Sequence, residues 1–388
     1  MKINLIIPSF YPATVYGGPI FSTLHTCEAL SELDDVEVYV STTNTNRDSK
    51  LDVEKNSWVK FNDNFFVKYY DETKIDKFSL SLFLNVWKDI KASDVVHVQG
   101  IFSTPTPVAL CYAFLFRKPI IMSPRGSFCE WCLAQGSKFK KLWMKTVINP
   151  FGNHVHWHAT SEAEKEDILK LFPKSQVHVV PNGTDLDSFS NVNTLDKTTY
   201  ANKYIGKELT PSKIIVSMGR LHKVKGFDIL IKSFIAVIKT HSDAILLIAG
   251  KDVGEKENLE TLVREHGLEN SIYFVGEVSD QDKIDFLGNA DLFVLSSHTE
   301  NFGNVYVESL AAGTPIVAST GTPWQEVEEA NCGKWVENSV EETSSAILDM
   351  LEKDRKKMRV NARKLAQKYD WKNIAVQFKE VFDGMVVK

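Results

Sequence analysis

The sequence predicts an α/β protein with two doubly wound parallel sheets. Short runs rich in β-branched residues alternate with amphipathic helical stretches along the whole chain. A polar segment at residues 186–213 interrupts this alternation near the middle. The length of 388 residues is sufficient for two large cores. We therefore expect two Rossmann-like domains that face one another across a cleft, with ligands bound beyond the carboxyl ends of the strands.

Each half of the chain contains five predicted strands, and helical stretches such as residues 20–33 separate them. The first set comprises residues 2–7, 36–41, 95–99, 119–123 and 177–180. The second set comprises residues 214–218, 244–248, 272–275, 292–295 and 316–318. Because the polar segment resembles a linker, we place the N-terminal domain at residues 1–185 and the C-terminal domain at residues 186–369.

The composition argues against several classes of protein. With 43% hydrophobic and 24% charged residues, the chain is not collagen, a coiled coil or a disordered protein. Its net charge of −5 does not suit general nucleic-acid binding. Five cysteines form no disulfide framework in a chain of this length, so we expect a cytoplasmic location. The N-terminal apolar run is too short for a signal peptide, and the longest apolar stretch, residues 108–116, is half of the ~20 residues that span a bilayer.

One segment has the composition of a helix that lies on a membrane surface. Lys138, Lys140, Lys141 and Lys145 alternate with large apolar side chains between residues 139 and 147. An ordinary amphipathic helix with a solvated lysine face would show the same pattern, and the sequence leaves both interpretations open.

Two motifs that follow predicted strands could bind phosphate. Gly17-Gly18 precedes Pro19 in a turn that opens a helix, where free backbone N–H groups can hold an anion, although a plain strand-to-helix turn has the same appearance. Arg220 and Lys225 follow the strand at residues 214–218. An arginine fork and a lysine point charge at that place suit a diphosphate, while surface charge is the alternative.

The third motif runs from Glu300 to Glu308. A Phe302-Gly303 turn leads into a helix near Asn304, and the free N–H groups around Val305 predict a phosphate site at the positive helix end. Two carboxylates that flank a phosphate site can accept hydrogen bonds from the hydroxyls of a sugar and of a ribose. Glutamate near a helix start also stabilises the helix, but this does not explain Glu300.

Together these motifs resemble the signature of the retaining GT-B glycosyltransferases of glycosyltransferase family 4. The resemblance extends over essentially the whole chain in the family's order, and it includes residues 159–162, 180–183 and 312–315. Residues 123–126 and 321–324 look like those of enzymes that build bacterial surface polysaccharides. The resemblance implies the GT-B fold, in which the last helix, about residues 370–388 here, returns to the first domain.

The resemblance also implies a role for each candidate residue. Arg220 and Lys225 would hold the diphosphate of the donor, Glu300 would contact the donor sugar, and Glu308 would contact the ribose. We take Arg220, Lys225 and Glu300 as the catalytic candidates. The complete set of donor-binding candidates is Gly17, Gly18, Arg220, Lys225, Gly250, Val278, Glu300, Asn301, Phe302, Gly303, Asn304, Val305 and Glu308.

On the acceptor side, the chain departs from its relatives. Many of them have a second histidine where this chain has Gln99 after His97, and a histidine where it has Arg125. We take His97 and Arg125 as acceptor-side candidates, together with the loop at residues 127–136. The resemblance implies a UDP- or GDP-sugar donor, no cofactor or essential metal, and a saccharide or lipid-linked acceptor for O-antigen, capsule or exopolysaccharide at the inner face of the cytoplasmic membrane.

Three alternatives remain. The chain could be a sugar-nucleotide-binding subunit without activity, a GT-B epimerase or a phosphorylase.

A zinc site is a fourth, weaker hypothesis, because Cys129, Cys132, His154, His156 and His158 are zinc-ligand types. Buried thiols and hydrogen-bonded histidines are commoner than metal ligands, so we expect no metal there.

Overall fold

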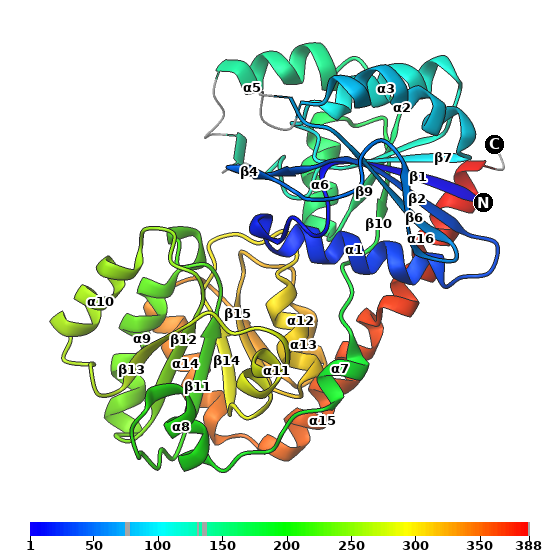
Figure 1. Ribbon diagram of the computed structural model, residues 1–388. Helices are drawn as coiled ribbons and strands as arrows, with labels where there is room; N and C mark the ends of the chain where they lie inside the picture. The colour runs from blue at the N-terminus through cyan, green and yellow to red at the C-terminus, as the bar shows by residue number, and fades with distance from the viewer. Residues whose placement is uncertain (74–77, 130–131, 134–137, 387–388) are drawn as a thin grey trace. The chain divides into compact units, whose positions relative to one another are not determined.

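The computed structural model describes residues 1–73, 78–129, 132–133 and 138–386, and it divides the chain into two compact units (Figure 1). Unit 1 contains Met1–Gly183 and Trp371–Lys388, and unit 2 contains Thr184–Asp370. Each unit is a mostly or fully parallel sheet with helices on both faces, so the prediction of two Rossmann-like α/β domains is confirmed. None of the helices in the described residues has both the length and the apolar character that crossing a membrane requires.

Unit 1 is built on an eight-stranded sheet that is parallel except at one edge, where β5 runs antiparallel to β6. Its strands, in spatial order, are β10 (Gln176–Val179), β9 (His156–Ala159), β8 (Ile120–Ser123), β7 (Val95–Gln99), β1 (Lys2–Ser9), β2 (Glu37–Thr43), β6 (Phe65–Tyr70) and β5 (Trp58–Asn62). Three strands of this sheet, β5, β6 and β9, were absent from the predicted set.

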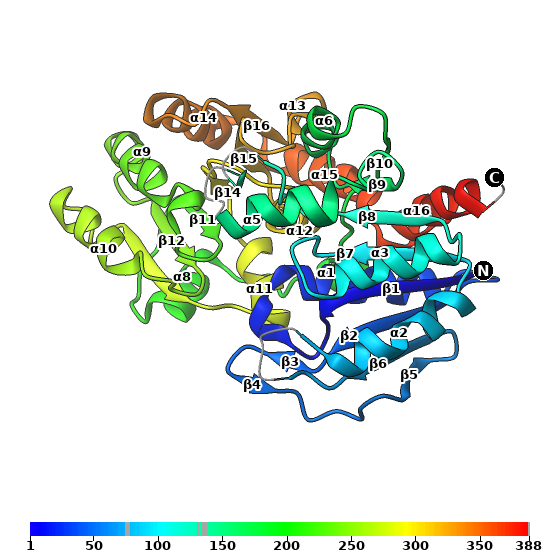
Figure 2. The same cartoon turned by 90° about the horizontal axis from the view of Figure 1, so that it is seen from above.

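The central strands of unit 1 are apolar on both faces because helices cover both. On β1, Ile3 and Leu5 face one core cluster and Ile6 faces the other, as the two-residue period of a strand requires. α2 (Leu80–Ala92), α3 (Pro105–Leu115), α5 (Lys138–Trp143) and α6 (Glu162–Leu171) pack with one cluster. α1 (Gly18–Ser31) and α16 (Trp371–Val386) pack together on the other (Figure 2).

The last helix belongs to unit 1, as the predicted fold class requires. Ile374, Phe378, Phe382 and Met385 are buried at helical spacing and form one face of α16. They pack in the same core as Leu24 of α1.

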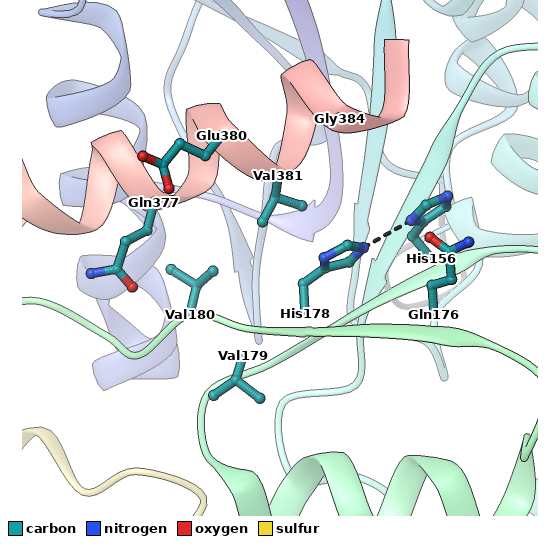
Figure 3. A pocket seen from close by; sticks show the side chains of 9 residues that line it. All are labelled: His156, Gln176, His178, Val179, Val180, Gln377, Glu380, Val381 and Gly384. Carbon is teal, nitrogen blue, oxygen red and sulfur yellow. Dashed lines mark hydrogen bonds between the residues drawn. The ribbon is translucent and has the colours of Figure 1, made fainter. Parts of the chain in front are cut away.

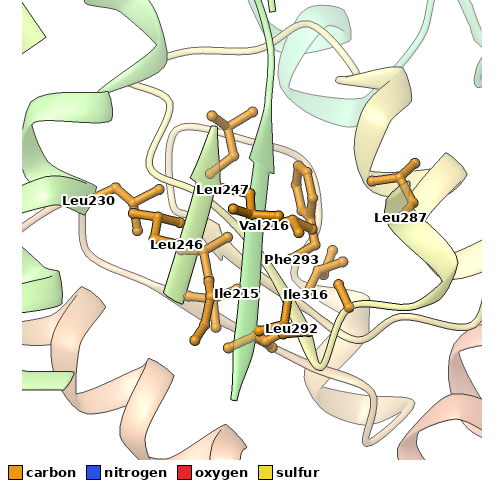
Figure 4. Close-up of a cluster of buried hydrophobic side chains, with 14 of the residues drawn as sticks. Ile215, Val216, Leu230, Leu246, Leu247, Leu287, Leu292, Phe293 and Ile316 are labelled. Atoms are coloured by element: carbon orange, nitrogen blue, oxygen red, sulfur yellow. The ribbon is translucent and has the colours of Figure 1, made fainter. Parts of the chain in front are cut away.

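Unit 2 is built on a six-stranded parallel sheet. The spatial order is β13 (Ile272–Gly276), β12 (Ile245–Ala249), β11 (Ile214–Met218), β14 (Leu292–Leu295), β15 (Ile316–Ser319) and β16 (Gly333–Val336). The covering helices are α9 (Phe227–Thr240), α10 (Lys256–Glu265), α11 (Asp280–Gly288), α12 (Asn304–Ala311), α13 (Glu326–Glu329), α14 (Val340–Glu352) and α15 (Arg355–Ala366). Figure 4 shows the strand side chains of this core between Leu230 of α9 and Leu287 of α11.

The strand order of unit 2 reverses between β11 and β14, which are neighbours in space but not in sequence. The connection from β11 leads into α9, and the connection from β14 leads into α12. In open α/β sheets this switch point is the usual ligand site.

The polar segment at residues 186–213 is not a linker, and that interpretation was wrong. It contains α7 (Leu186–Ser190) and α8 (Lys197–Ile205), which Asp185 and Asp196 cap at their N-termini. Tyr200 is buried, and its hydroxyl donates to the carbonyl of Phe286 at 2.7 Å. A few well-placed apolar side chains therefore attach a mostly polar segment to unit 2.

Candidate active site

The first site residue, Arg220, follows β11 directly at the switch point of unit 2. Its side chain is exposed, and within the part of the chain that the structure describes its guanidinium forms no hydrogen bond or ion pair. Arginine presents a planar fork of N–H donors that matches phosphate oxygens. This position therefore offers a positive charge with unused hydrogen-bonding capacity.

Lys225 and Glu300 form an ion pair at the same switch point. The Lys225 ammonium donates to Oε1 of Glu300, and each side chain is only 14% exposed. The Ser297 hydroxyl, at the end of β14, also donates to that oxygen, at 2.9 Å. The loops after β11 and β14 are thus joined through side chains that lie 75 residues apart in the sequence.

A glycine holds the Lys225 loop against the end of β14. Gly226 has a φ of +62°, and a Cβ there would lie 1.8 Å from the Ser296 carbonyl oxygen. Only glycine fits at this distance. The ammonium of Lys225 is therefore positioned by the backbone as well as by Glu300.

The turn before α12 is fixed by aromatic packing. Phe302 is buried, its ring packs against those of Trp324 and Tyr369, and its carbonyl accepts a hydrogen bond from Trp324 Nε1 at 2.7 Å. Gly303 has a φ of +80°, and a Cβ there would lie 2.7 Å from the buried ring of Tyr306. The first N–H groups of α12, which begins at Asn304, have no acceptor within the helix and mark its positive end.

Glu308 is paired with a lysine that the sequence did not reveal. Lys283 of α11 donates to Glu308 Oε1 at 2.9 Å, and both side chains are about three-quarters buried. Because Lys283 precedes Glu308 by 25 residues on another helix, no local motif connects them. A ribose hydroxyl bound at Glu308 would share this carboxylate with the lysine.

The glycine at position 250 has a packing role. A Cβ at Gly250 would lie 1.8 Å from the Gly219 carbonyl oxygen, and its N–H donates to the carbonyl of Gly276 at 2.7 Å. The ends of β11, β12 and β13 therefore meet at glycines. Val278 follows this junction and is half-buried against the core of unit 2.

Gly17 and Gly18 differ from Gly250, because no atom lies within 4 Å of a Cβ built on either one. Gly17 needs glycine for its φ of +76°, whereas Gly18 is the first residue of α1 and has no such requirement. Packing therefore does not explain why position 18 is a glycine.

His97 lies in the core of unit 1, which the sequence did not predict. Its ring is 1% exposed, and burial holds its pKa well below the usual value. Nε2 lies 2.7 Å from Ser123 Oγ, which lies 2.7 Å from Nδ1 of His158, and His158 Nε2 donates to the Val180 carbonyl at 2.8 Å. With 1% of its surface exposed and Nε2 bonded to Ser123, His97 offers almost no surface to an acceptor.

Arg125 lies at the carboxyl end of the unit 1 sheet. Its guanidinium donates to Asn182 Oδ1 at 2.8 Å and to Gln99 Oε1 at 3.1 Å. The structure thus brings together two positions at which the chain departs from its relatives, Gln99 and Arg125.

Three of the four lysines around α5 are exposed. Lys138, Lys141 and Lys145 are exposed, whereas Lys140 is half-buried and donates to the Cys132 carbonyl at 2.9 Å. The α5 helix also exposes Phe139 (68%) and Leu142 (57%). Within the candidate acceptor loop at residues 127–136, residues 130–131 and 134–136 lie outside the described residues.

The hypothetical zinc ligands lie apart. Cys129 and Cys132 are free thiols, and the Cys132 N–H contacts Cys129 Sγ at 3.3 Å. His158 is in the chain with Ser123, and His156 faces His178. In the described ranges, no group of three or more His, Cys, Asp or Glu residues is placed to hold a metal ion.

A cavity of about 570 Å³ lies in unit 1 between strand β10 and helix α16 (Figure 3). His156 Nδ1 and His178 Nε2 lie 2.9 Å apart on its strand side, with stacked rings, and Gln377 and Glu380 project from α16. None of the predicted site residues lines this cavity.

Comparisons with known proteins agree with this architecture. The family described as Glycosyltransferase Family 4 matches residues 16–188, and the one described as Glycosyl transferases group 1 matches residues 202–368. The structure of Anabaena HepE in complex with UDP superposes with a TM-score of 0.75 at 18% identity, over 99% of this chain and 100% of that one.

Two curated relatives are more similar in sequence. Mannosylfructose-phosphate synthase of Agrobacterium fabrum is 34% identical over 153 residues, which are 38% of this chain and 33% of that enzyme. GDP-mannose:cellobiosyl-diphosphopolyprenol alpha-mannosyltransferase of Xanthomonas oryzae pv. oryzae is 25% identical over 297 residues, which are 74% of this chain and 73% of that enzyme. The chain thus spans only a third of the first relative.

The fold is that of the GT-B glycosyltransferases, and both family matches are to glycosyltransferase models. More particularly, the N-terminal half of the chain resembles Glycosyltransferase Family 4 and the C-terminal half resembles Glycosyl transferases group 1.

Proposed function

We propose that this protein transfers a sugar from a UDP- or GDP-sugar to a hydroxyl of a lipid-linked saccharide, with retention of the anomeric configuration, in the synthesis of O-antigen, capsule or exopolysaccharide. The observation that carries the proposal is the arrangement at the switch point of unit 2. There, the exposed Arg220 and the Lys225–Glu300 pair lie at the ends of the adjacent strands β11 and β14. No cofactor or essential metal is part of the proposal.

The chemistry follows from charge. As the bond from sugar to phosphate breaks, negative charge builds on the diphosphate while the sugar becomes oxocarbenium-like. Arg220 offers its whole guanidinium, and Lys225 uses one ammonium hydrogen for Glu300 and retains two for phosphate oxygens. Because such hydrogen-bond donors are already in place, they stabilise the negative charge on the leaving group and need not reorient during the reaction. In the front-face mechanism that the family resemblance implies, the departing phosphate oxygen takes the acceptor proton.

Glu300 has two tasks in this proposal. One carboxylate oxygen neutralises Lys225 and accepts from Ser297, which leaves the other oxygen for a hydroxyl of the donor sugar. The first turn of α12 would hold the sugar-side phosphate. The names of the relatives support the substrate classes, since one specifies a GDP-mannose donor with a diphosphopolyprenol-linked acceptor, and HepE was solved with UDP.

We also propose a cytoplasmic location with peripheral membrane contact through α5 and the helical turn at Met144–Ile148 that follows it. The exposed Lys138, Lys141 and Lys145 would attract anionic lipid headgroups, and Phe139 and Leu142 would enter the interface. Lys140, which the sequence analysis included, is excluded from this surface because it bonds to the Cys132 carbonyl and lies over the Phe102 ring.

The test is acceptor-dependent release of nucleoside diphosphate by the purified protein. UDP-, GDP- and ADP-sugars are first compared by thermal shift, because a ligand that binds the folded state stabilises it. The stabilising donor is then incubated with and without a lipid-linked oligosaccharide. Release only with acceptor supports transfer. Conversion of the donor without acceptor would indicate an epimerase, and binding without turnover a non-catalytic subunit. NMR of the product determines whether the configuration is retained.

A further inference from the structure

Arg125 belongs to a polar cluster at the carboxyl ends of the unit 1 strands. Gln99 is the last residue of β7, Arg125 follows β8 by two positions, and Asn182 follows β10. Thr23 of α1 lies within hydrogen-bond distance of Gln99 Oε1, at 3.0 Å. The cluster is therefore formed at the carboxyl end of a parallel sheet, where ligands usually bind in such folds, together with a side chain from the second turn of α1.

The geometry of the cluster fixes which atoms are engaged. Arginine can only donate, so the atoms that face its two Nη groups must be the oxygens of Gln99 and Asn182. This orientation turns Nε2 of Gln99 away from the guanidinium. The backbone of Arg125 has a left-handed φ of +53°, and the next N–H, of Gly126, donates to Glu164 Oε1 at 2.6 Å.

Two donors of the cluster are buried without an acceptor. Among the described residues, neither Arg125 Nε nor Gln99 Nε2 has a hydrogen-bond partner, and Gln99 is only 2% exposed. Native structures satisfy almost all buried polar groups, because an unmade bond costs about 1–3 kcal/mol. Both unused donors belong to side chains that bond to each other, so one bound group could satisfy them together.

Arg125 also has no direct ionic partner. Within the described residues, its guanidinium bonds to the amide oxygens of Asn182 and Gln99 and forms no ion pair with a carboxylate. The nearby Glu164 uses its oxygens for the N–H groups of Gly126 and Thr160 and for the Thr160 hydroxyl. Burial lowers the pKa of Arg125, and Glu164 only partly opposes this shift. Arg125 is half-buried, and a partly desolvated cation without a paired anion costs free energy in the unbound protein.

We propose that Arg125 and Gln99 bind an oxyanion of a substrate, either a sugar carboxylate or a phosphate. The guanidinium supplies Nε–H as part of a bidentate fork, and the Gln99 amide supplies a second donor. Only the assignment of this oxyanion to a glycosyl donor or acceptor rests on the proposed function. The binding of an anion by unit 1 does not.

The test measures the affinity of the whole protein for three small probes at constant ionic strength: sodium glucuronate, inorganic phosphate and uncharged glucose. The variants are Arg125→Gln, Arg125→Lys and Gln99→Leu. Arg117→Gln is the matched control, since Arg117 also has a left-handed φ, of +54°, but its side chain is exposed. Ligand-free melting temperatures verify that each variant is folded.

We expect at least one anionic probe to bind wild type and Arg117→Gln equally, and Arg125→Gln at least ~10-fold more weakly. Preference for glucuronate indicates a sugar carboxylate, and preference for phosphate indicates a phosphate group. Because phosphate can also bind at Arg220, the loss must occur with Arg125→Gln and not with Arg220→Ala. Equal anion affinities for wild type and Arg125→Gln, or a loss that glucose shares, would overturn the proposal. Absence of glycosyl transfer would leave this binding difference unchanged, so the two proposals fail separately.

Discussion

The Lys225 ammonium and the Glu300 carboxylate form a largely buried ion pair that links the loops after β11 and β14, the two strands between which the strand order of unit 2 reverses. Because Ser297 also donates to Glu300, the pair is part of a small network and not an isolated contact. Such a network holds the ammonium in one orientation toward a ligand. An exposed lysine would have to lose side-chain conformational entropy to reach the same orientation.

Removal of either cation at the switch point should impair turnover. We expect Arg220→Ala and Lys225→Ala to reduce kcat/KM at least ~100-fold, because each removes a fixed donor to the leaving diphosphate. Lys223→Ala is the matched control, because Lys223 is on the same turn with its side chain 80% exposed. Steady-state kinetics checks this. Near wild-type rates for both Arg220→Ala and Lys225→Ala would exclude the proposed donor site.

The ion pair should also contribute to stability, in contrast to Arg220. We expect Lys225→Met to destabilise the protein by on the order of 1–3 kcal/mol, since Glu300 would lose its charged partner in a largely buried place. The double variant Lys225→Met/Glu300→Gln should recover part of this loss. Urea unfolding of the four proteins in a double-mutant cycle measures the coupling. If the two substitutions change the free energy of unfolding additively, the ion pair contributes no coupling and this prediction is wrong.

Replacement by alanine should affect stability at one glycine and donor binding at another. Gly250→Ala places Cβ 1.8 Å from a carbonyl oxygen, so we expect a loss of more than ~3 kcal/mol or failure to fold. Gly18→Ala meets no atom within 4 Å, so we expect unchanged stability with weaker donor binding. Thermal unfolding and donor titration separate the two effects. If Gly18→Ala binds the donor normally, this turn has no role in binding.

The buried histidines of unit 1 should make its stability depend on pH. Burial lowers the pKa of His158 from 6.5 to about 3. The unfolded chain therefore takes up the proton first, and the stabilisation is complete above pH 6.5 and decreases as the pH falls toward 3. The variant His158→Gln can still donate to the Val180 carbonyl but has no imidazole to protonate. Between pH 7 and pH 5 we expect its free energy of unfolding to fall by on the order of 1–2 kcal/mol less than that of wild type.

Hydrogen exchange of the β9 amides, compared at the two pH values, measures this difference within unit 1. Equal losses in the two proteins would show that His158 does not account for the pH dependence.

Membrane contact should depend on three lysines and not on the fourth. We expect the triple variant Lys138→Gln/Lys141→Gln/Lys145→Gln to lose co-sedimentation with vesicles that contain anionic phospholipid. Each lysine near such a surface contributes about 1 kcal/mol of binding free energy. Lys140→Gln should leave binding intact, because that lysine is engaged inside unit 1. Unchanged co-sedimentation of the triple variant would contradict the membrane proposal.

The sequence predicted the fold class and the two loops of the unit 2 site because both depend on local patterns. β11 and β14 are short continuous apolar runs, and the glycine turns have φ requirements, so both signals are visible in a few residues. The pairing of Glu308 with Lys283 and the burial of His97 depend on contacts between distant elements, and no spacing rule encodes them. The polar segment was misjudged for the same reason, since Phe189 and Tyr200 attach it to unit 2 through a few long-range contacts.

The membership of α16 in unit 1 has a consequence for how the protein is made. Residues 184–370 are synthesised as a continuous block and contain all that unit 2 needs for its core. The core beneath α1 requires Ile374, Phe378 and Phe382, which leave the ribosome after all of unit 2. We therefore expect unit 2 to fold on the nascent chain while unit 1 still exposes an apolar face of its sheet. A ribosome-bound chain that ends before residue 371 should accordingly depend on chaperones for unit 1 and not for unit 2.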